Sequence, residues 1–190
     1  MFKGIPKPVK VFLLRACLLF AVWKIIYILV LVPREIPDAW LVKRLGTHTA
    51  SALSMAYGNG TFEATHIRKV KQYGSDKVWV THSFVYKKNL RYVLGIYQAC
   101  DGLELMILTV GFFVCFMGGW WVKLLYSVAS VLGLYLLNVA RCSMLAFVNL
   151  EYPQHFEFAH KYLFNLVVYG FTFLMWMSYV QQIKKTLQKA

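Results

Sequence analysis

The chain has 190 residues, of which 59% are hydrophobic and 17% aromatic, and its mean hydropathy is +0.52. This composition is too apolar for an ordinary soluble domain, in which about half of the residues are apolar, and it indicates a protein that lies in a lipid bilayer. The net charge of +13 does not predict nucleic-acid binding, because the Lys and Arg residues cluster at the chain ends and in one middle segment rather than along one polar face.

The first predicted element is a membrane-spanning helix over residues 11–32. This apolar segment has the length of about 20 residues that a spanning helix needs, and Pro33 follows it. Lysines precede it and no small-residue cleavage site comes after it, so we expect a retained anchor rather than a cleaved signal peptide. Arg15 can reach the interface, whereas Lys24 lies deeper and is expected to face protein or headgroups.

The next segment, residues 34–99, is expected to face water. It contains ten basic and four acidic residues and no stretch that could cross a bilayer. Within it, residues 38–57 place apolar side chains at near-helical spacing, which predicts an amphipathic helix at the membrane interface. The apolar face of this helix consists of Trp40, Leu41, Leu45, Leu53 and Ala56.

A small β-hairpin is predicted at the end of this segment. Residues 78–86 and 91–97 are rich in β-branched and aromatic side chains, which favour strands, and a Lys-Lys-Asn turn lies between them. The second strand leads directly towards Cys100.

Three further spans are predicted in the second half of the chain. Residues 103–117 are apolar, Gly118-Gly119 makes a tight break, and residues 120–150 form a second long apolar run. A polar connector with the helix-stopping Pro153 follows, and residues 158–183 form the last span. The predicted fold class is therefore an all-α membrane protein, a bundle of four transmembrane helices with a small extracytoplasmic segment that holds the amphipathic helix and the β-hairpin.

Four spans place both chain ends on one side of the membrane, and lysines flank the first and last spans. Because short basic segments stay in the cytoplasm, we expect both termini to be cytoplasmic in a cell (inner) membrane. The ten basic residues of the middle segment do not reverse this expectation, since the rule applies to short loops. The expected order is a cytoplasmic amino terminus (1–10), the first span (11–32), an extracytoplasmic segment (33–99), a three-helix catalytic region (100–183) and a cytoplasmic carboxyl terminus (184–190).

Cys100, Arg141 and His160 fall at the same predicted depth, near the outer face of the membrane. Cys100 precedes a helix, whose unpaired N–H groups and dipole favour the nucleophilic thiolate. Arg141 lies some twenty residues, about 30 Å, into the next long helix, where a permanent charge needs an anionic partner or a charged transition state. His160 opens the last span and can give and take a proton near neutral pH.

Structural roles stay open for each of these residues alone. A membrane cysteine is often an apolar packing residue, an arginine near the end of a span can reach the interface, and an interfacial histidine can meet water. Asn138, one turn before Arg141, could orient the guanidinium or bond a neighbouring helix, and Glu104 is a second candidate partner for Arg141. Whether Cys100 pairs with Cys142 is also open. The agreement in depth favours the catalytic interpretation.

No metal or cofactor site is predicted. The histidines are scattered, with no HExxH motif and no paired cysteine spacing, and we expect the others to be solvated or to lie on hairpin faces. The five histidines are His48, His66, His82, His155 and His160.

Three short motifs resemble, in order, the signatures of the exosortase/archaeosortase family, in the manner of its compact members. They are Gln-Ala-Cys100-Asp-Gly at a helix start, Asn138-Val-Ala-Arg141 in the next long span, and His160 at the opening of the last span. The resemblance covers roughly residues 90–170. It implies a membrane-embedded thiol protease or transpeptidase that needs no cofactor.

The resemblance also implies a role for each residue. Cys100 would attack a peptide carbonyl in the C-terminal sorting signal of an exported protein and form a thioester, Arg141 would stabilise the oxyanion or position the thiolate, and His160 would protonate the departing amine. The implied partner is an exported protein with a short C-terminal motif, a spanning helix and a basic tail. The acyl group would pass to water, or to an amine or lipid acceptor; a glycan acceptor is also possible.

Two other functions remain as alternatives. In the first, the chain is a non-enzymatic assembly or scaffold protein whose basic outer segment, with Arg68, Lys69 and Lys71, binds anionic lipid or glycan. In the second, it is a transporter or lipid-modifying enzyme in which Arg141 grips a phosphate or carboxylate headgroup.

Overall fold

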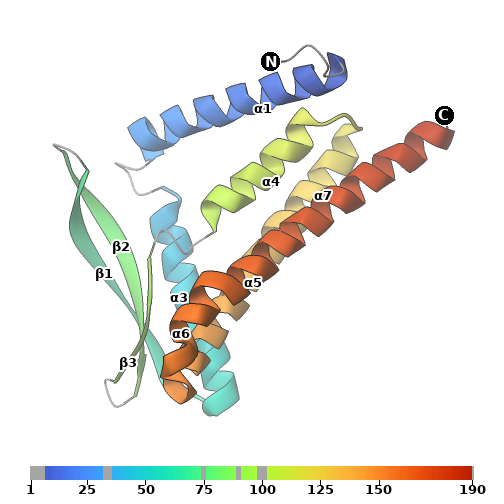
Figure 1. The fold of residues 1–190 in the computed structure, drawn as a ribbon. Coiled ribbons are helices and arrows are strands. Elements are labelled where there is room, and N and C mark those ends of the chain that lie inside the picture. The colour runs from blue at the N-terminus through green and yellow to red at the C-terminus, as the bar shows by residue number, and fades with distance from the viewer. Residues whose placement is uncertain (1–6, 32–35, 74–75, 89–90, 98–101, 190) are drawn as a thin grey trace.

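The fold combines a helical bundle with one small antiparallel sheet (Figure 1). It is a computed structural model, and it describes residues 7–31, 36–73, 76–88, 91–97 and 102–189. In chain order the elements are α1 (Lys7–Ile26), the π-helical turn η1 (Tyr27–Leu31), α3 (Asp38–Tyr57), β1 (Phe62–Tyr73), β2 (Asp76–Lys87), β3 (Arg91–Ile96), α4 (Leu103–Cys115), α5 (Trp120–Glu151), the short turns η3 (Pro153–His155) and α6 (Phe156–Phe158), the π-helical turn η4 (Ala159–Leu163) and α7 (Phe164–Lys189).

Three helical stretches in the described residues are long and apolar enough to cross a membrane: Leu13–Leu31, Trp120–Glu151 and Pro153–Thr186. The sequence predicted four. The remaining segment forms α4, which has 13 residues and is therefore about 20 Å long, shorter than a hydrocarbon core of about 30 Å. By length, then, the count of four spans is not confirmed.

α4 nevertheless runs alongside much of α5. Gly102, at its start, lies against Asn138, and near its end the Nζ atom of Lys123 donates a hydrogen bond of 3.0 Å to the carbonyl of Val114. These two points are separated by 15 residues of α5, or about 22 Å. The loop after α4 is held by the hydroxyl of the buried Tyr179, which donates to the carbonyl of Met117 at 3.0 Å.

The sheet has the order β1-β2-β3, and both pairs of strands are antiparallel. The prediction of a hairpin from the second and third strands is confirmed, but β1 was missed. β1 pairs along its whole length with β2, from Phe62 opposite Lys87 to Tyr73 opposite Asp76. The fold is thus mostly helical, with a sheet of three strands rather than two.

α3 covers one face of this sheet, and its bounds, Asp38–Tyr57, are those predicted from the sequence. Three of the predicted apolar positions, Leu41, Leu45 and Leu53, are buried, whereas Trp40 is 61% exposed. The contact is close at Gly46, where an added Cβ would overlap the Oγ atom of Ser83. The buried Ser54 hydroxyl donates to the carbonyl of Phe62 at this interface.

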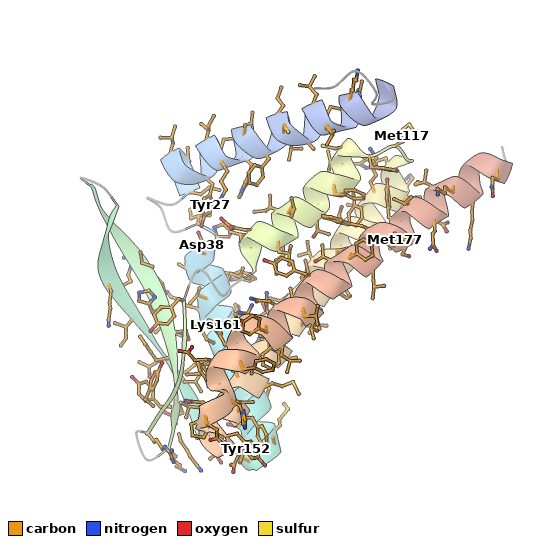
Figure 2. The ribbon with its side chains drawn as sticks, viewed as in Figure 1. Tyr27, Asp38, Met117, Tyr152, Lys161 and Met177 are labelled. Carbon is orange, nitrogen blue, oxygen red and sulfur yellow. The ribbon has the colours of Figure 1, made fainter. Side chains whose placement is uncertain are left out.

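The sheet and α3 lie at the end of the bundle where α5 ends and α6 begins, which we call the sheet end (Figure 1). The start of α1 and the end of α7 lie at the opposite end. Tyr27 and Asp38 join η1 to the beginning of α3 (Figure 2), with the Tyr27 hydroxyl 3.1 and 3.2 Å from the two carboxylate oxygens.

Candidate active site

Helix α5 is longer than a bilayer requires, and Arg141 lies beyond its middle. Its 32 residues extend about 48 Å, while the hydrocarbon core is about 30 Å thick. Arg141 lies about 32 Å from the beginning of α5, counted from Trp120. The following residues Cys142, Leu145 and Ala146 are buried in the core that α5 shares with α3 and the sheet. Arg141 therefore lies directly before the part of α5 that packs on α3 and the sheet.

Asn138 brings α5 against the beginning of α4. Its side chain is 1% exposed, and its Nδ2 atom occupies the space in which a Cβ atom on residue 102 would lie. Gly102 also has a positive φ of +76°, a conformation that favours glycine. Any larger residue at position 102 would both strain the backbone and displace Asn138. Cys100 is two residues earlier and lies outside the described residues.

Arg141 lies on α5 and His160 lies in η4, and these two elements pack against each other. Both side chains are half-buried, and Arg141 is one of the charges that act on the His160 imidazole, together with Lys161 and Glu157. The imidazole stacks nearly parallel on the Phe156 ring, with the centroids 5.9 Å apart and the planes 4° apart. Among the residues that the structure describes, no carboxylate pairs with Arg141.

His160 lies in the π-helical turn η4, next to the Lys161 that Figure 2 labels. Such widened turns are rare in helices and are frequent at functional sites. Lys161 itself is directed to Glu157, with Nζ and Oε2 2.8 Å apart. His160 thus lies beside an exposed ion pair, and both charges of this pair act on the imidazole.

Glu104, which the sequence offered as a partner of Arg141, has a different role. Glu104 pairs with Lys24 of α1, with Oε1 and Nζ 2.6 Å apart. This ion pair answers two points that the sequence left open, because it gives the deep Lys24 a protein partner and directs Glu104 towards α1. It also fixes α1 to the first turn of α4.

Other histidines have other partners. His48 contacts Tyr135, His66 contacts Ser83, and His82 contacts Phe84 and Tyr97. Within the described part of the chain, no group of three or more His, Cys, Asp or Glu side chains is placed to hold a metal ion.

The comparison with protein families identifies the chain. Residues 11–178 match the family model of the transmembrane exosortases. The chain belongs to the transmembrane exosortase family. The chain matches no curated protein and no solved structure. Membership confirms the resemblance drawn from the three short motifs and, together with the three apolar helices, establishes this exosortase as a membrane protein.

Two features of the exosortase site were not predicted. The packing of Asn138 on Gly102 depends on how α4 crosses α5, although the glycine itself was visible in the Cys-Asp-Gly motif. The π-helical turn around His160 and its stacking on Phe156 left no recognisable signal in the sequence. The structure brings Asn138 against Gly102, and it places Arg141 and His160 on two elements that pack together, α5 and η4.

Proposed function

We propose that this exosortase is a membrane-embedded cysteine protease or transpeptidase. Cys100 acts as the nucleophile, and Arg141 and His160 assist it. The substrate is an exported protein with a C-terminal sorting signal, made of a short motif, a spanning helix and a basic tail. The product is released to water or transferred to an acceptor.

One observation carries this proposal: the side chain of Asn138 lies against Gly102, two residues after Cys100. Asn138 and Arg141 are one turn apart on α5, so this contact brings the Arg141 turn close to Gly102 at the start of α4. His160 supplies the third group, because its turn η4 packs on α5 and the charge of Arg141 acts on its ring. Family membership supports the same chemistry.

The proposed reaction divides the cleavage into two steps. The Cys100 thiolate attacks the peptide carbonyl carbon, and the Arg141 guanidinium, which no described carboxylate neutralises, stabilises the oxyanion that forms. The C–N bond then breaks, His160 gives a proton to the departing amine, and a thioester remains. In the second step the neutral His160 removes a proton from water or from the acceptor, which attacks the thioester and releases the thiolate.

The proposed topology places this site at the extracytoplasmic face of the inner membrane, with both termini in the cytoplasm. The start of α1 and the end of α7 lie together at the opposite end from the sheet, in keeping with this arrangement (Figure 1). A membrane-impermeant thiol reagent should label Cys100 in intact spheroplasts. It should not label Cys17, because the exposed side chain of Cys17 lies on the spanning helix α1 and would face lipid.

The test of the activity is the mass of the carboxyl terminus of a co-expressed candidate substrate. Cys100→Ala, Arg141→Ala and His160→Ala should each abolish or strongly reduce the new terminus. Loss of one preorganised oxyanion donor costs about 10²–10³ in rate, so Arg141→Ala should be severe. Any mass added at the new terminus identifies the acceptor.

Each variant has a control of the same residue type elsewhere in the chain. These controls are Cys115→Ala, Arg15→Ala and His155→Ala. They should leave processing within about twofold, as surface changes distant from the reacting atoms usually do. Processing by Cys100→Ala would overturn the proposal. A loss caused by neutralising Arg68 and Lys69, with Cys100→Ala unaffected, would instead favour the scaffold alternative.

A further inference from the structure

The exposed side of α3 carries a stripe of residues that the proposed reaction does not use. Trp40, Arg44 and His48 follow one another at intervals of four residues, so they lie on one face of the helix. All three are exposed, while the opposite side of α3 packs on the sheet. This stripe is polar and aromatic at once, which is typical of helices that lie at a membrane interface.

The stripe meets α5 at Tyr135. The Tyr135 hydroxyl lies 2.8 Å from Nδ1 of His48, and the two rings meet edge to face with centroids 5.8 Å apart. Arg44 packs its guanidinium 5.9 Å from the centre of the Trp40 ring, and its charge acts on Tyr135. In the described part of the chain, no carboxylate pairs with Arg44. A guanidinium, an imidazole and a phenol thus converge without an acidic partner.

The position of Tyr135 relative to the membrane narrows the choice of ligand. Tyr135 lies about 22 Å along α5 from Trp120, near the end of the hydrocarbon region that faces the sheet end. On the Trp120 side of Tyr135, Leu125 and Leu132 lie seven residues apart on one face of α5 and are 67% and 59% exposed. In a spanning helix, exposed leucines face lipid chains. The polar cluster therefore lies directly above a surface that acyl chains cover.

We propose that Arg44, His48 and Tyr135 bind the phosphate of a membrane phospholipid, with its acyl chains along Leu125 and Leu132. An arginine binds phosphate oxygens with two parallel N–H donors. His48 and Tyr135 are hydrogen-bonded to each other, and this pair adds the proton that its own bond leaves free, on the hydroxyl or on Nε2 according to the tautomer of His48. Trp40 fixes the guanidinium from one side and anchors α3 at headgroup level. A soluble anion would use the same donors but would gain nothing from the leucines. This site is one helical turn from Asn138, on the side of α5 that α3 covers.

The test measures binding of phosphatidylglycerol to the purified full chain in detergent, by native mass spectrometry. Arg44→Gln with His48→Gln should weaken binding at least about tenfold, since two donors to a charged group are lost. Lys184→Gln with Lys185→Gln removes charge at the opposite end of α7 and should change binding less than about twofold. Equal losses in both double variants would indicate only general attraction to the basic surface, and would overturn the proposal.

Three further measurements test the proposed phospholipid site. Tyr135→Phe removes only the hydroxyl, so it should weaken binding several-fold without altering ring packing, and it carries the test if the double variant fails to fold. Inorganic phosphate should not raise the unfolding temperature as phosphatidylglycerol does; equal protection by both would show a site for a free anion. Cys100→Ala should bind phosphatidylglycerol normally, because the site does not depend on the proposed reaction.

Discussion

The contact between Gly102 and Asn138 gives the most direct test of the site geometry. In Gly102→Ala, a left-handed backbone at φ +76° costs about 1–2 kcal/mol for a residue with a Cβ. The overlap of that Cβ with the Asn138 amide adds about 1–3 kcal/mol, as is usual for an overpacked interior. The free energy of unfolding should therefore fall by about 2–5 kcal/mol, which lowers the unfolding temperature by at least about 5 °C.

Gly60 provides a matched control, because its φ is +73° and nothing lies within 4 Å of an added Cβ. Gly60→Ala should lose only the backbone contribution of about 1–2 kcal/mol and should leave substrate processing unchanged. Gly102→Ala should lose more stability and should also reduce processing, because Asn138 is displaced. Both quantities can be measured on detergent-solubilised protein, by thermal unfolding and by the mass of the processed substrate.

A double variant distinguishes the backbone strain at residue 102 from the steric overlap with Asn138. Combining Gly102→Ala with Asn138→Ala removes the amide that the new Cβ would meet, so the overlap contribution should disappear while the backbone contribution stays. The reasoning would be refuted if Gly102→Ala were no more destabilising than Gly60→Ala, since Asn138 would then not fill the space beside Gly102.

Three further predictions concern the packing that supports the site. Gly46→Ala should lower the free energy of unfolding by about 1–3 kcal/mol through overlap with Ser83, and Ser83→Gly should restore part of the loss in thermal unfolding; no recovery would refute the contact. Tyr179→Phe should cost about 1 kcal/mol by thermal unfolding, because the Met117 carbonyl loses its donor; an unchanged stability would count against this bond. Burial lowers the pKa of His66 below its ordinary value, so folding favours the neutral ring. The stability that this contributes is present above about pH 6.5 and is lost as the pH falls towards the lowered pKa. Between about pH 7 and pH 5, the unfolding temperature of the wild type should therefore fall more than that of His66→Gln. An equal fall in both proteins would contradict this prediction.

The sequence by itself determined the elements that depend on local pattern. The bounds of α3 followed from apolar residues at helical spacing, and the long apolar runs predicted the spans around α1, α5 and α7. The order of three short motifs was enough to indicate the family that the comparison then showed. These properties depend on residues that are close together in the sequence, so they can be found without knowledge of the folded chain.

Strand β1 could not be predicted from local sequence pattern. Its Arg68 and Lys69 give it a charged character that hid the strand, and it is ordered by pairing with β2 along its length. The same limit applies to α5, whose apolar run predicted a span but not that its last residues would be buried against α3 and the sheet.

Only the tertiary structure decided which residues meet. Glu104 pairs with Lys24, 80 residues away, rather than with Arg141, and Gly102 admits the Asn138 amide because α4 begins beside the middle of α5. Contacts of this kind depend on the crossing of separate helices and on the space left between their side chains, which spacing along the chain does not encode. Composition and periodicity thus placed this chain in the membrane, whereas packing between distant segments brought Asn138 against Gly102 and Glu104 to Lys24.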